Sequence, residues 1–195
     1  MNYLTLDEIK KIELDILVYF DDFCKNEGLY YTLAGGTLLG AIRHGGFIPW
    51  DDDIDVIMPR KDYNRMLQIV RKKNEESDFD FLVPGASDYF YPFVKICNNK
   101  TVAEMDDNYS NHGIWVDILP MDNLPEDDEL LRKLFKKTRF WRAVVISMTT
   151  KLSGEKNIKK KIAKLVLKIY ANLYGKTKVV KKANQVAQSY NDVET

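Results

Sequence analysis

The sequence lacks the long apolar segments that mark membrane-spanning and secreted proteins. It contains no run of about eighteen or more apolar residues, so we expect no helix that spans a bilayer. Its first fifteen residues, MNYLTLDEIKKIELD, become charged before an apolar secretory segment could form, so we predict no signal peptide. These absences favour a folded, soluble protein of the cytoplasm.

Cysteine is also scarce, with two residues in the chain, Cys24 and Cys97. Their positions match no metal-ligand spacing and leave no partners for a disulfide framework. We therefore predict two thiols that pack as small apolar groups in a reducing compartment.

The sequence does contain enough apolar residues for one sizeable core, and its charge is unevenly distributed. Apolar residues make up 45% of the 195 positions and aromatic residues 12%, which suffices for one core or for a core with a helical appendage. Residues 1–130 hold 12 Lys and Arg against 26 Asp and Glu, a net charge of −14, whereas residues 131–195 hold 17 against 3, a net charge of +14. An acidic front part therefore precedes a basic tail.

The periodicity of the apolar residues predicts an α/β core followed by a helical tail. Helical spacing predicts helices over 9–24, 37–42, 63–70 and 158–173, and a wholly helical pattern from Glu126. Short apolar runs predict strands over 30–34, 56–58, 79–83, 90–97, 101–105 and 113–119, the last closed by Pro120. We place the change near Pro125, which gives a core over 1–125 and a helical, basic region over 126–195.

One stretch, residues 34–56, combines two features that suggest a site for phosphate and a cation. It reads AGGTLLGAIRHGGFIPWDDDIDV. The glycine pair stands where a strand pattern turns into a helical pattern, and backbone N–H groups at such a helix start can point at an anion. Further on, four acids repel one another, Asp51, Asp52, Asp53 and Asp55. Burying any of them unpaired would cost several kcal/mol, and a divalent cation would remove that cost.

The last two of these acids share one side of a predicted strand. Alternation puts Asp53 and Asp55 on one face, with Ile54 and Val56 on the other, so both carboxylates could share hard cations with a phosphate. An EF-hand calcium loop fits poorly, because Val56 stands where that loop needs glycine and Asp62 where it prefers glutamate. Two alternatives stay open: the Asp-x-Asp pair of metal-dependent glycosyltransferases, which hold a nucleotide sugar through a cation, and a solvated acidic turn.

Another carboxylate, Asp117, lies far downstream in GIWVDILPMDN, where it interrupts an apolar strand pattern. An unpaired charge in a buried strand is costly, so such an acid is usually functional or paired. If its strand lies beside the Asp53 strand, three carboxylates converge, and three carboxylates around two Mg²⁺ ions are the usual arrangement for in-line displacement at phosphorus. The alternative is a salt bridge from Asp117 to Arg43 or Arg60.

The order of these motifs resembles the polymerase β type of the nucleotidyltransferase superfamily: a glycine pair, a hydroxyl residue, Asp-hydrophobic-Asp, and a later Asp on a strand. Within it, GGTLLGAIRHGGFIPWDDDIDVIMPRKDY closely resembles the LicD family, relatives of fukutin. FYPFVKICNNKT and GIWVDILPMDNLP extend the likeness to about residues 20–125. The resemblance implies an α+β class, with a nucleotidyltransferase-fold mixed sheet flanked by helices and a helical C-terminal region.

The same resemblance implies a metal-dependent phosphotransferase. Such an enzyme moves phosphocholine, or a similar phospho-alcohol group, from a CDP-linked donor such as CDP-choline to a hydroxyl of a bacterial cell-surface glycan, a lipopolysaccharide or teichoic-acid-type precursor, and releases CMP. Two other classes stay open: a nucleotidylyltransferase that uses an NTP and releases pyrophosphate, and a non-catalytic binding member of the fold.

The family pattern assigns metal and phosphate roles to residues of this sequence. Asp53 and Asp55 would bind Mg²⁺ or Mn²⁺, and Asp117 would be the third ligand or the base for the acceptor hydroxyl. The candidates for binding the donor phosphates are Gly35, Gly36, Thr37, Arg43 and Lys95. His44 could contact the diphosphate or, equally, form a structural hydrogen bond.

If the donor carries choline, its quaternary ammonium group is best recognised by aromatic faces. The candidates in the matching segments are Tyr89, Phe90, Tyr91 and Trp115. Another phospho-alcohol would need polar contacts instead.

The basic tail contains a helix pattern with two kinds of face. Its apolar stripe comprises Ile158, Ile162, Leu165, Val166, Ile169, Tyr170 and Leu173, and its lysines stand at 159, 160, 161, 164 and 168. A basic amphipathic helix can lie on an anionic membrane, here the inner face, which would suit a lipid-linked glycan acceptor. Alternatively, the stripe packs on the core and the lysines are solvated. We expect no nucleic-acid binding, because the tail contains no motif typical of nucleic-acid recognition and the presumed catalytic face is acidic.

Overall fold

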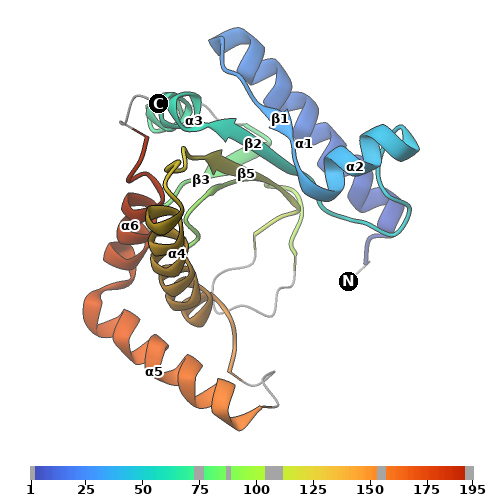
Figure 1. Cartoon of the computed structure of the whole chain (residues 1–195). Coiled ribbons are helices and arrows are strands. Elements are labelled where there is room, and N and C mark those ends of the chain that lie inside the picture. Colours follow the sequence, from blue (N-terminus) through green and yellow to red (C-terminus); the bar gives the residue numbers. More distant parts are fainter. Residues whose placement is uncertain (1–2, 73–76, 87–88, 104–111, 153–156, 192–195) are drawn as a thin grey trace. The chain divides into compact units, whose positions relative to one another are not determined.

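The computed structural model describes residues 3–72, 77–86, 89–103, 112–152 and 157–191. Its helices and strands are α1 (Leu6–Glu27), β1 (Thr32–Leu33), α2 (Gly35–His44), β2 (Asp55–Pro59), α3 (Arg60–Val70), β3 (Phe79–Leu82), β4 (Val94–Asn98), β5 (Trp115–Met121), α4 (Asp128–Thr149), α5 (Ile158–Tyr174) and α6 (Lys176–Ala187) (Figure 1). Among the described helices, none is long and apolar enough to cross a bilayer.

The chain forms two compact units. The first, here called the sheet unit, comprises Met1–Val83, Phe93–Glu104 and Asn111–Met121. The second, the helical unit, comprises Pro84–Pro92, Met105–Ser110 and Asp122–Thr195. The segment from Pro84 to Pro92 thus leaves the sheet unit between β3 and β4, and the chain returns to it for β4.

One five-stranded sheet, in the order β1-β2-β5-β4-β3, lies at the centre of the sheet unit. β2 and β5 run parallel, and the other neighbouring pairs are antiparallel. This mixed sheet with its helices confirms the α+β class. It also confirms that the Asp117 strand lies beside the strand that follows the acidic cluster, because Asp55 on β2 is the register partner of Asp117 on β5.

The core of the sheet unit lies on one face of these two strands. Their fully buried side chains are Val56 and Met58 on β2 and Val116 and Ile118 on β5. They form one cluster with side chains of α1 and α3, among them Ile16, Phe20, Tyr63 and Met66. Since successive side chains of a strand point to opposite faces, Asp55 and Asp117 project from the other face of the sheet.

The predicted helix over 9–24, observed as α1, and the two predicted buried thiols are confirmed in this unit. α1 begins with a capping box between Thr5 and Glu8 and ends at Gly28, whose φ of 59° is left-handed. Cys24 and Cys97 are both buried free thiols, and burial raises the pKa of each to about 12. They pack as small apolar groups.

Several predicted strand boundaries differ from the structure, among them both ends of the predicted strand over 30–34, which is reduced to Thr32–Leu33. β4 begins at Val94 rather than at residue 90, because Pro92 has no N–H to donate to a sheet. Residues 101–103 form no strand, since the Thr101 hydroxyl accepts the N–H of Ile114 at 2.9 Å; the rest of that predicted strand lies outside the described residues. β5 continues through Pro120, where it pairs with β2 and no longer with β4, so the missing N–H leaves the ladder intact.

The helical unit has a core of its own. α4, α5 and α6 contribute to it through Val144, Val145, Met148, Ala171, Val179 and Val180. The ring of Trp141 on α4 contacts those of Tyr170 and Tyr174 on α5, with centroids 6.4 and 5.6 Å apart. Ala171 is the buried residue of α5, whereas the predicted apolar stripe of that helix is exposed. Among the described residues, the stripe packs on this unit through the ring of Tyr170, and its other members are exposed.

Candidate active site

The site is built around two acids that the sheet brings side by side. Asp55, the first residue of β2, stands opposite Asp117 of β5, and both side chains project from the same face. Burial raises the pKa of Asp55, repulsion by Asp117 raises it further, and Lys95 opposes the rise. The carboxylates thus lie close enough to disfavour each other's negative charge.

Lys95, on the neighbouring strand β4, supplies a positive charge beside these acids. It stands opposite Asp117 in the antiparallel register of β4 and β5, and its Nζ lies 2.6 Å from Asp117 Oδ1. The Lys95 side chain is 6% exposed and that of Asp117 is 21% exposed. Burial raises the pKa of Asp117, and the ion pair with Lys95 opposes that rise. The predicted salt bridge of Asp117 therefore exists, but its partner is Lys95 rather than Arg43 or Arg60.

Asp53 lies in the loop before β2, and α2 holds this loop in place. The hydroxyl of Thr37, in the first turn of α2, accepts the N–H of Asp55 at 2.9 Å and donates to the carbonyl oxygen of Asp53 at 3.5 Å. Burial raises the pKa of Asp53, and repulsion by Asp51 and Asp55 adds to the rise. Thr37, predicted to hold phosphate, thus fastens the acidic loop through its side chain.

The glycine pair lets the acidic loop approach the start of α2 closely. Gly35 has a φ of +51°, and a Cβ there would lie 3.7 Å from Asp55 Oδ2. A Cβ on Gly36 would lie 2.6 Å from Asp51 Oδ2, closer than real side chains approach. Both glycines are the first residues of α2, where backbone N–H groups have no acceptor within the helix. The predicted glycine turn is therefore a helix N-terminus that faces carboxylates.

A divalent cation suits the chemistry of these residues. Asp53, Asp55 and Asp117 offer carboxylate oxygens, the ligands that Mg²⁺ prefers. Burial is the main cause of the raised pKa of all three acids, and repulsion by neighbouring acids adds to it, so a bound cation would favour their charged forms. Within the described chain, however, no three His, Cys, Asp or Glu side chains already form a group that could hold a metal ion. Binding a cation would therefore require these side chains to move closer together.

Sequence reasoning missed one acid of this region, Glu13 on α1. It is 4% exposed, and its Oε2 has no hydrogen-bond partner among the residues that the structure describes. Burial raises its pKa to about 8, and repulsion by Asp52, Asp53 and Asp117 contributes. A signal existed in the sequence, because Glu13 stands at helical spacing from Ile9 and Ile16, on the apolar face of the predicted helix.

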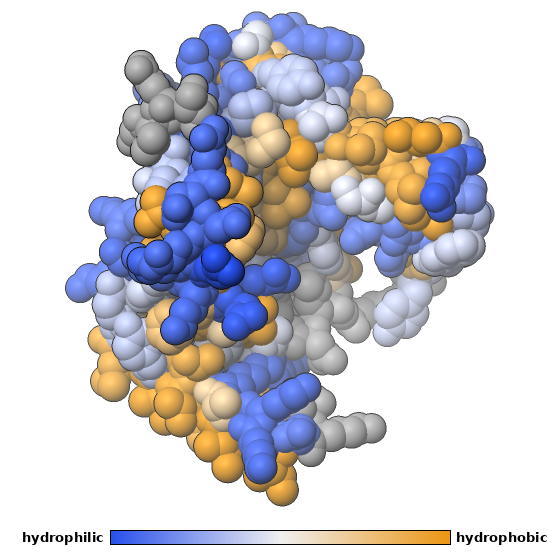
Figure 2. Space-filling view, viewed as in Figure 1, coloured by the Kyte–Doolittle hydropathy of each residue, from blue (hydrophilic) through white to orange (hydrophobic). Residues whose placement is uncertain are grey.

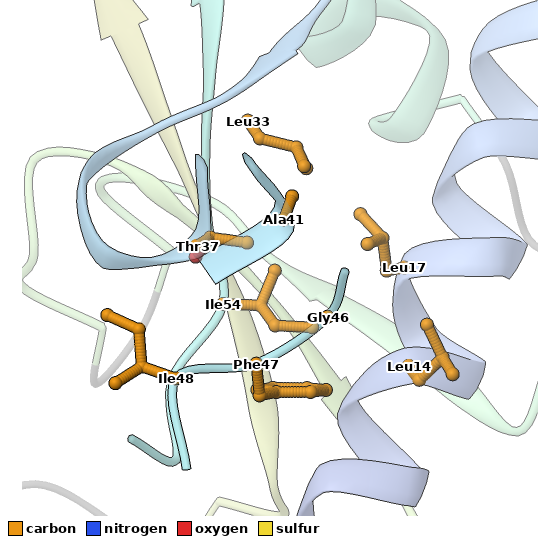
Figure 3. A pocket seen from close by; sticks show the side chains of 9 residues that line it. All are labelled: Leu14, Leu17, Leu33, Thr37, Ala41, Gly46, Phe47, Ile48 and Ile54. Atoms are coloured by element: carbon orange, nitrogen blue, oxygen red, sulfur yellow. The ribbon is translucent and has the colours of Figure 1, made fainter. Parts of the chain in front are cut away.

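An apolar pocket lies next to the acidic loop. Its volume is about 170 Å³, and it is lined by Leu14, Leu17, Leu33, Thr37, Ala41, Gly46, Phe47, Ile48 and Ile54. Figure 3 shows Leu14 and Leu17 projecting from α1 toward Ile54 and the 46–48 loop. No charged side chain lines the pocket, so it suits an apolar group and not a phosphate.

The remaining predicted residues lie in other places. Arg43 is exposed in the last turn of α2, at the opposite end of that helix from the glycine pair. Trp115, of the sheet unit, has its ring centroid 4.2 Å from Lys95 Nζ. Tyr89 and Tyr91 belong to the helical unit, where their ring centroids lie 5.6 Å apart, and Tyr89 is 3% exposed.

Comparison with known proteins agrees with the motif pattern. A family model described as LicD/FKTN/FKRP, nucleotidyltransferase domain, matches residues 28–144. The chain is 36% identical over 140 residues to the lipopolysaccharide cholinephosphotransferase LicD of Haemophilus influenzae, an alignment that covers 71% of this chain and 52% of that protein. It is 62% identical over 29 residues to the ribitol 5-phosphate transferase FKRP of Homo sapiens, which covers 15% and 6% of the two chains. The chain thus spans about half the length of the Haemophilus relative.

Proposed function

This chain belongs to the LicD/FKTN/FKRP family, and from that premise we propose that it is a metal-dependent transferase that moves a phospho-alcohol group from a CDP-linked donor to a hydroxyl of a glycan. The observation that carries the proposal is the position of Asp55 opposite Asp117, with Asp53 in the loop that Thr37 fastens. Asp55 and Asp117 lie on the face of the sheet away from its core, and Asp53 and Asp55 lie beside the first turn of α2.

The proposed reaction is a displacement at phosphorus. The glycan hydroxyl oxygen forms a bond to the phosphorus that bears the alcohol, the bond from that phosphorus to the bridging oxygen of the diphosphate breaks, and CMP leaves with the electron pair. The hydroxyl proton passes to a base or to water. A bound divalent cation would stabilise the charge on the transferring group and on the leaving phosphate.

We assign the cation to Asp53, Asp55 and Asp117, with Mg²⁺ as the expected ion and Mn²⁺ as a substitute. Asp117 is a ligand first and a base second, because ligation lowers the basicity of a carboxylate. Its carboxylate already interacts with Lys95 through Oδ1 and with the Trp115 side chain, so a cation would share this carboxylate with both partners. Lys95 then serves as a positioning residue for Asp117 and as a positive charge near the donor diphosphate.

The backbone N–H groups at Gly35, Gly36 and Thr37 are the proposed contacts for the donor phosphates, because a helix N-terminus carries partial positive charge. Arg43 remains a second candidate for the diphosphate. The side chain of Thr37 serves the acidic loop instead, through its two contacts to the backbone of that loop.

For the transferred group we favour phosphocholine. The Haemophilus relative is named as a cholinephosphotransferase, and the Trp115 ring already contacts an ammonium group, that of Lys95. Trp115 is the proposed aromatic contact for choline within the sheet unit. The predicted choline contacts of Tyr89 and Tyr91, which belong to the helical unit, stay predictions. The acceptor would be a lipid-linked bacterial glycan precursor at the cytoplasmic face of the membrane.

The test incubates the purified chain with CDP-choline, Mg²⁺ and a lipopolysaccharide glycan, and follows phosphorus-containing products by ³¹P NMR. The proposal expects CMP and a choline phosphodiester, and both should be lost in Asp53→Asn but not in Asp15→Asn, an exposed acid of α1. If the protein uses CDP-ribitol as donor but not CDP-choline, it is still a phospho-alcohol transferase, and the assignment of choline as the transferred alcohol is wrong. Pyrophosphate from an NTP, without CMP from any CDP-alcohol, would instead establish a nucleotidylyltransferase, and no turnover with unchanged cation binding in Asp53→Asn would favour a non-catalytic member.

A further inference from the structure

α5 carries an apolar stripe that the rest of the described chain leaves open. The residues of this α5 stripe follow one another at helical spacing and are between 45% and 84% exposed: Ile158, Ile162, Leu165, Val166, Ile169 and Leu173. In the view of Figure 2, hydrophobic side chains lie next to hydrophilic ones over the position of α5 in Figure 1. Six large aliphatic side chains on one helix face are more than the scattered exposure of an ordinary surface.

The stripe is not the face by which α5 is held in the helical unit. That attachment uses Ala171, which is 0% exposed, the partly buried Leu167, and the rings of Tyr170 and Tyr174 against Trp141. At about 100° per residue, Ala171 and Leu167 lie on the side of the helix opposite to Ile162 and Ile169. Tyr170, counted with the predicted stripe, is therefore left out of the α5 stripe as defined here. α5 is therefore anchored by one face while its most apolar face stays in contact with water.

The charges of α5 are all of one sign. Its sequence, IKKKIAKLVLKIYANLY, contains five lysines and no acid. By the same helical geometry, Lys159 lies at one margin of the stripe, and Lys161 and Lys168 lie at the other. A lysine at such a margin can lay its methylene chain along an apolar surface and keep its ammonium group in a polar layer.

We propose that α5 docks on an anionic phospholipid bilayer, lying in the headgroup layer with the stripe toward the acyl chains and the marginal lysines against lipid phosphates. The pattern fits an interfacial helix, which combines an apolar face with a lysine-rich polar face and lies in the membrane plane. Each lysine near such a surface adds electrostatic attraction. The docking does not depend on catalysis.

Other occupants fit these features less well. A nucleic acid would contact the lysines and leave the apolar stripe in water. A second copy of α5, packed stripe to stripe, would bring the lysine margins of two helices together, and like charges repel. An anionic bilayer accommodates both kinds of side chain at the depths where the helix places them.

The test is co-sedimentation of the full chain with vesicles, read out on protein alone. Vesicles of phosphatidylcholine with about one-third phosphatidylglycerol should bind the protein, and vesicles of phosphatidylcholine alone should bind it at least about tenfold more weakly. Raising the salt concentration should weaken the binding, because salt screens the lysines. The double variant Ile162→Asp with Ile169→Asp should lose binding by more than about tenfold.

Matched variants separate docking on a bilayer from general charge and from misfolding. Val18→Asp introduces a charge at an apolar residue of α1 that is 53% exposed, and Lys136→Glu with Lys137→Glu reverses two exposed charges of α4; both should bind vesicles nearly as the natural chain does. Circular dichroism should show the same helix content in all variants. The proposal is overturned if anionic vesicles do not bind the protein, if the stripe variant binds as well as the natural chain, or if the stripe mediates self-association without vesicle binding.

Discussion

Asp55 and Asp117 come from positions 62 residues apart, and the parallel pairing of β2 with β5 sets them opposite each other on one face of the sheet. Lys95 reaches Asp117 from the strand on its other side, with Nζ 2.6 Å from Oδ1. Three neighbouring strands thus present two acids and one lysine, whose net negative charge is the basis of the proposed cation site.

Asp55→Asn and Asp117→Asn should each reduce CMP release by about 100-fold or more, because each removes an anionic oxygen where a cation would stabilise charge. Each variant should also bind Mn²⁺ more weakly, measured by electron paramagnetic resonance. The melting temperature should stay equal or rise in Asp55→Asn, since repulsion between the two acids is relieved. Unchanged Mn²⁺ affinity in both variants would contradict the assignment of these ligands.

Lys95→Met should destabilise the fold by about 3 kcal/mol, because it leaves Asp117 charged and partly buried without its partner. Urea unfolding measures the loss. The double variant Lys95→Met with Asp117→Asn should recover much of it, since the unpaired charge is then absent. Strictly additive losses would mean that the two side chains do not interact in solution. Mg²⁺ should stabilise Lys95→Met more than the natural chain, because a cation can replace the missing ammonium group.

Glu13→Gln should change how stability depends on pH. The pKa of Glu13 rises from 4.5 to about 8 on folding, so the folded state holds this proton more tightly than the unfolded chain does. Stability should therefore fall as the pH rises through that window, and the full loss, on the order of several kcal/mol, should be present above about pH 8. Glutamine carries no charge, so the variant should lack this fall.

Urea unfolding at about pH 5 and about pH 9 tests this expectation. The Gln variant should be close to the natural chain at the lower pH and clearly more stable at the higher one. Asp15→Asn serves as the control, because Asp15 is exposed on the same helix. If Glu13→Gln follows the same pH slope as the natural chain, Glu13 does not hold a proton in the folded state.

Gly36→Ala should weaken Mn²⁺ binding and turnover by about two- to threefold, because its Cβ would lie 2.6 Å from Asp51 Oδ2 and push the end of that side chain away from the start of α2. Gly46→Ala is the matched control. A Cβ on Gly46 meets nothing within 4 Å, so that variant should be neutral or slightly stabilising. Equal effects of the two substitutions would show that the close approach at Gly36 is unimportant.

Local sequence patterns were enough to predict much of the fold. The spacing of apolar residues predicted α1 and α3, and the glycine pair predicted the start of α2, because helix periodicity and glycine conformation are properties of short segments. The strand boundaries were predicted less well. Whether Pro120 ends β5 depends on which neighbouring strand is present at that residue, and the residue itself does not encode this.

The sequence by itself determined the family, the acidic loop after the glycine turn, and the isolated acid at Asp117, because these are motifs of residue type and order. Tertiary structure alone decided which groups meet: the register that sets Asp55 and Lys95 beside Asp117, the burial of Glu13 near the acids, and the exposure of the α5 stripe. The physical reason is that pairing and burial depend on segments distant in the chain, which no local pattern specifies.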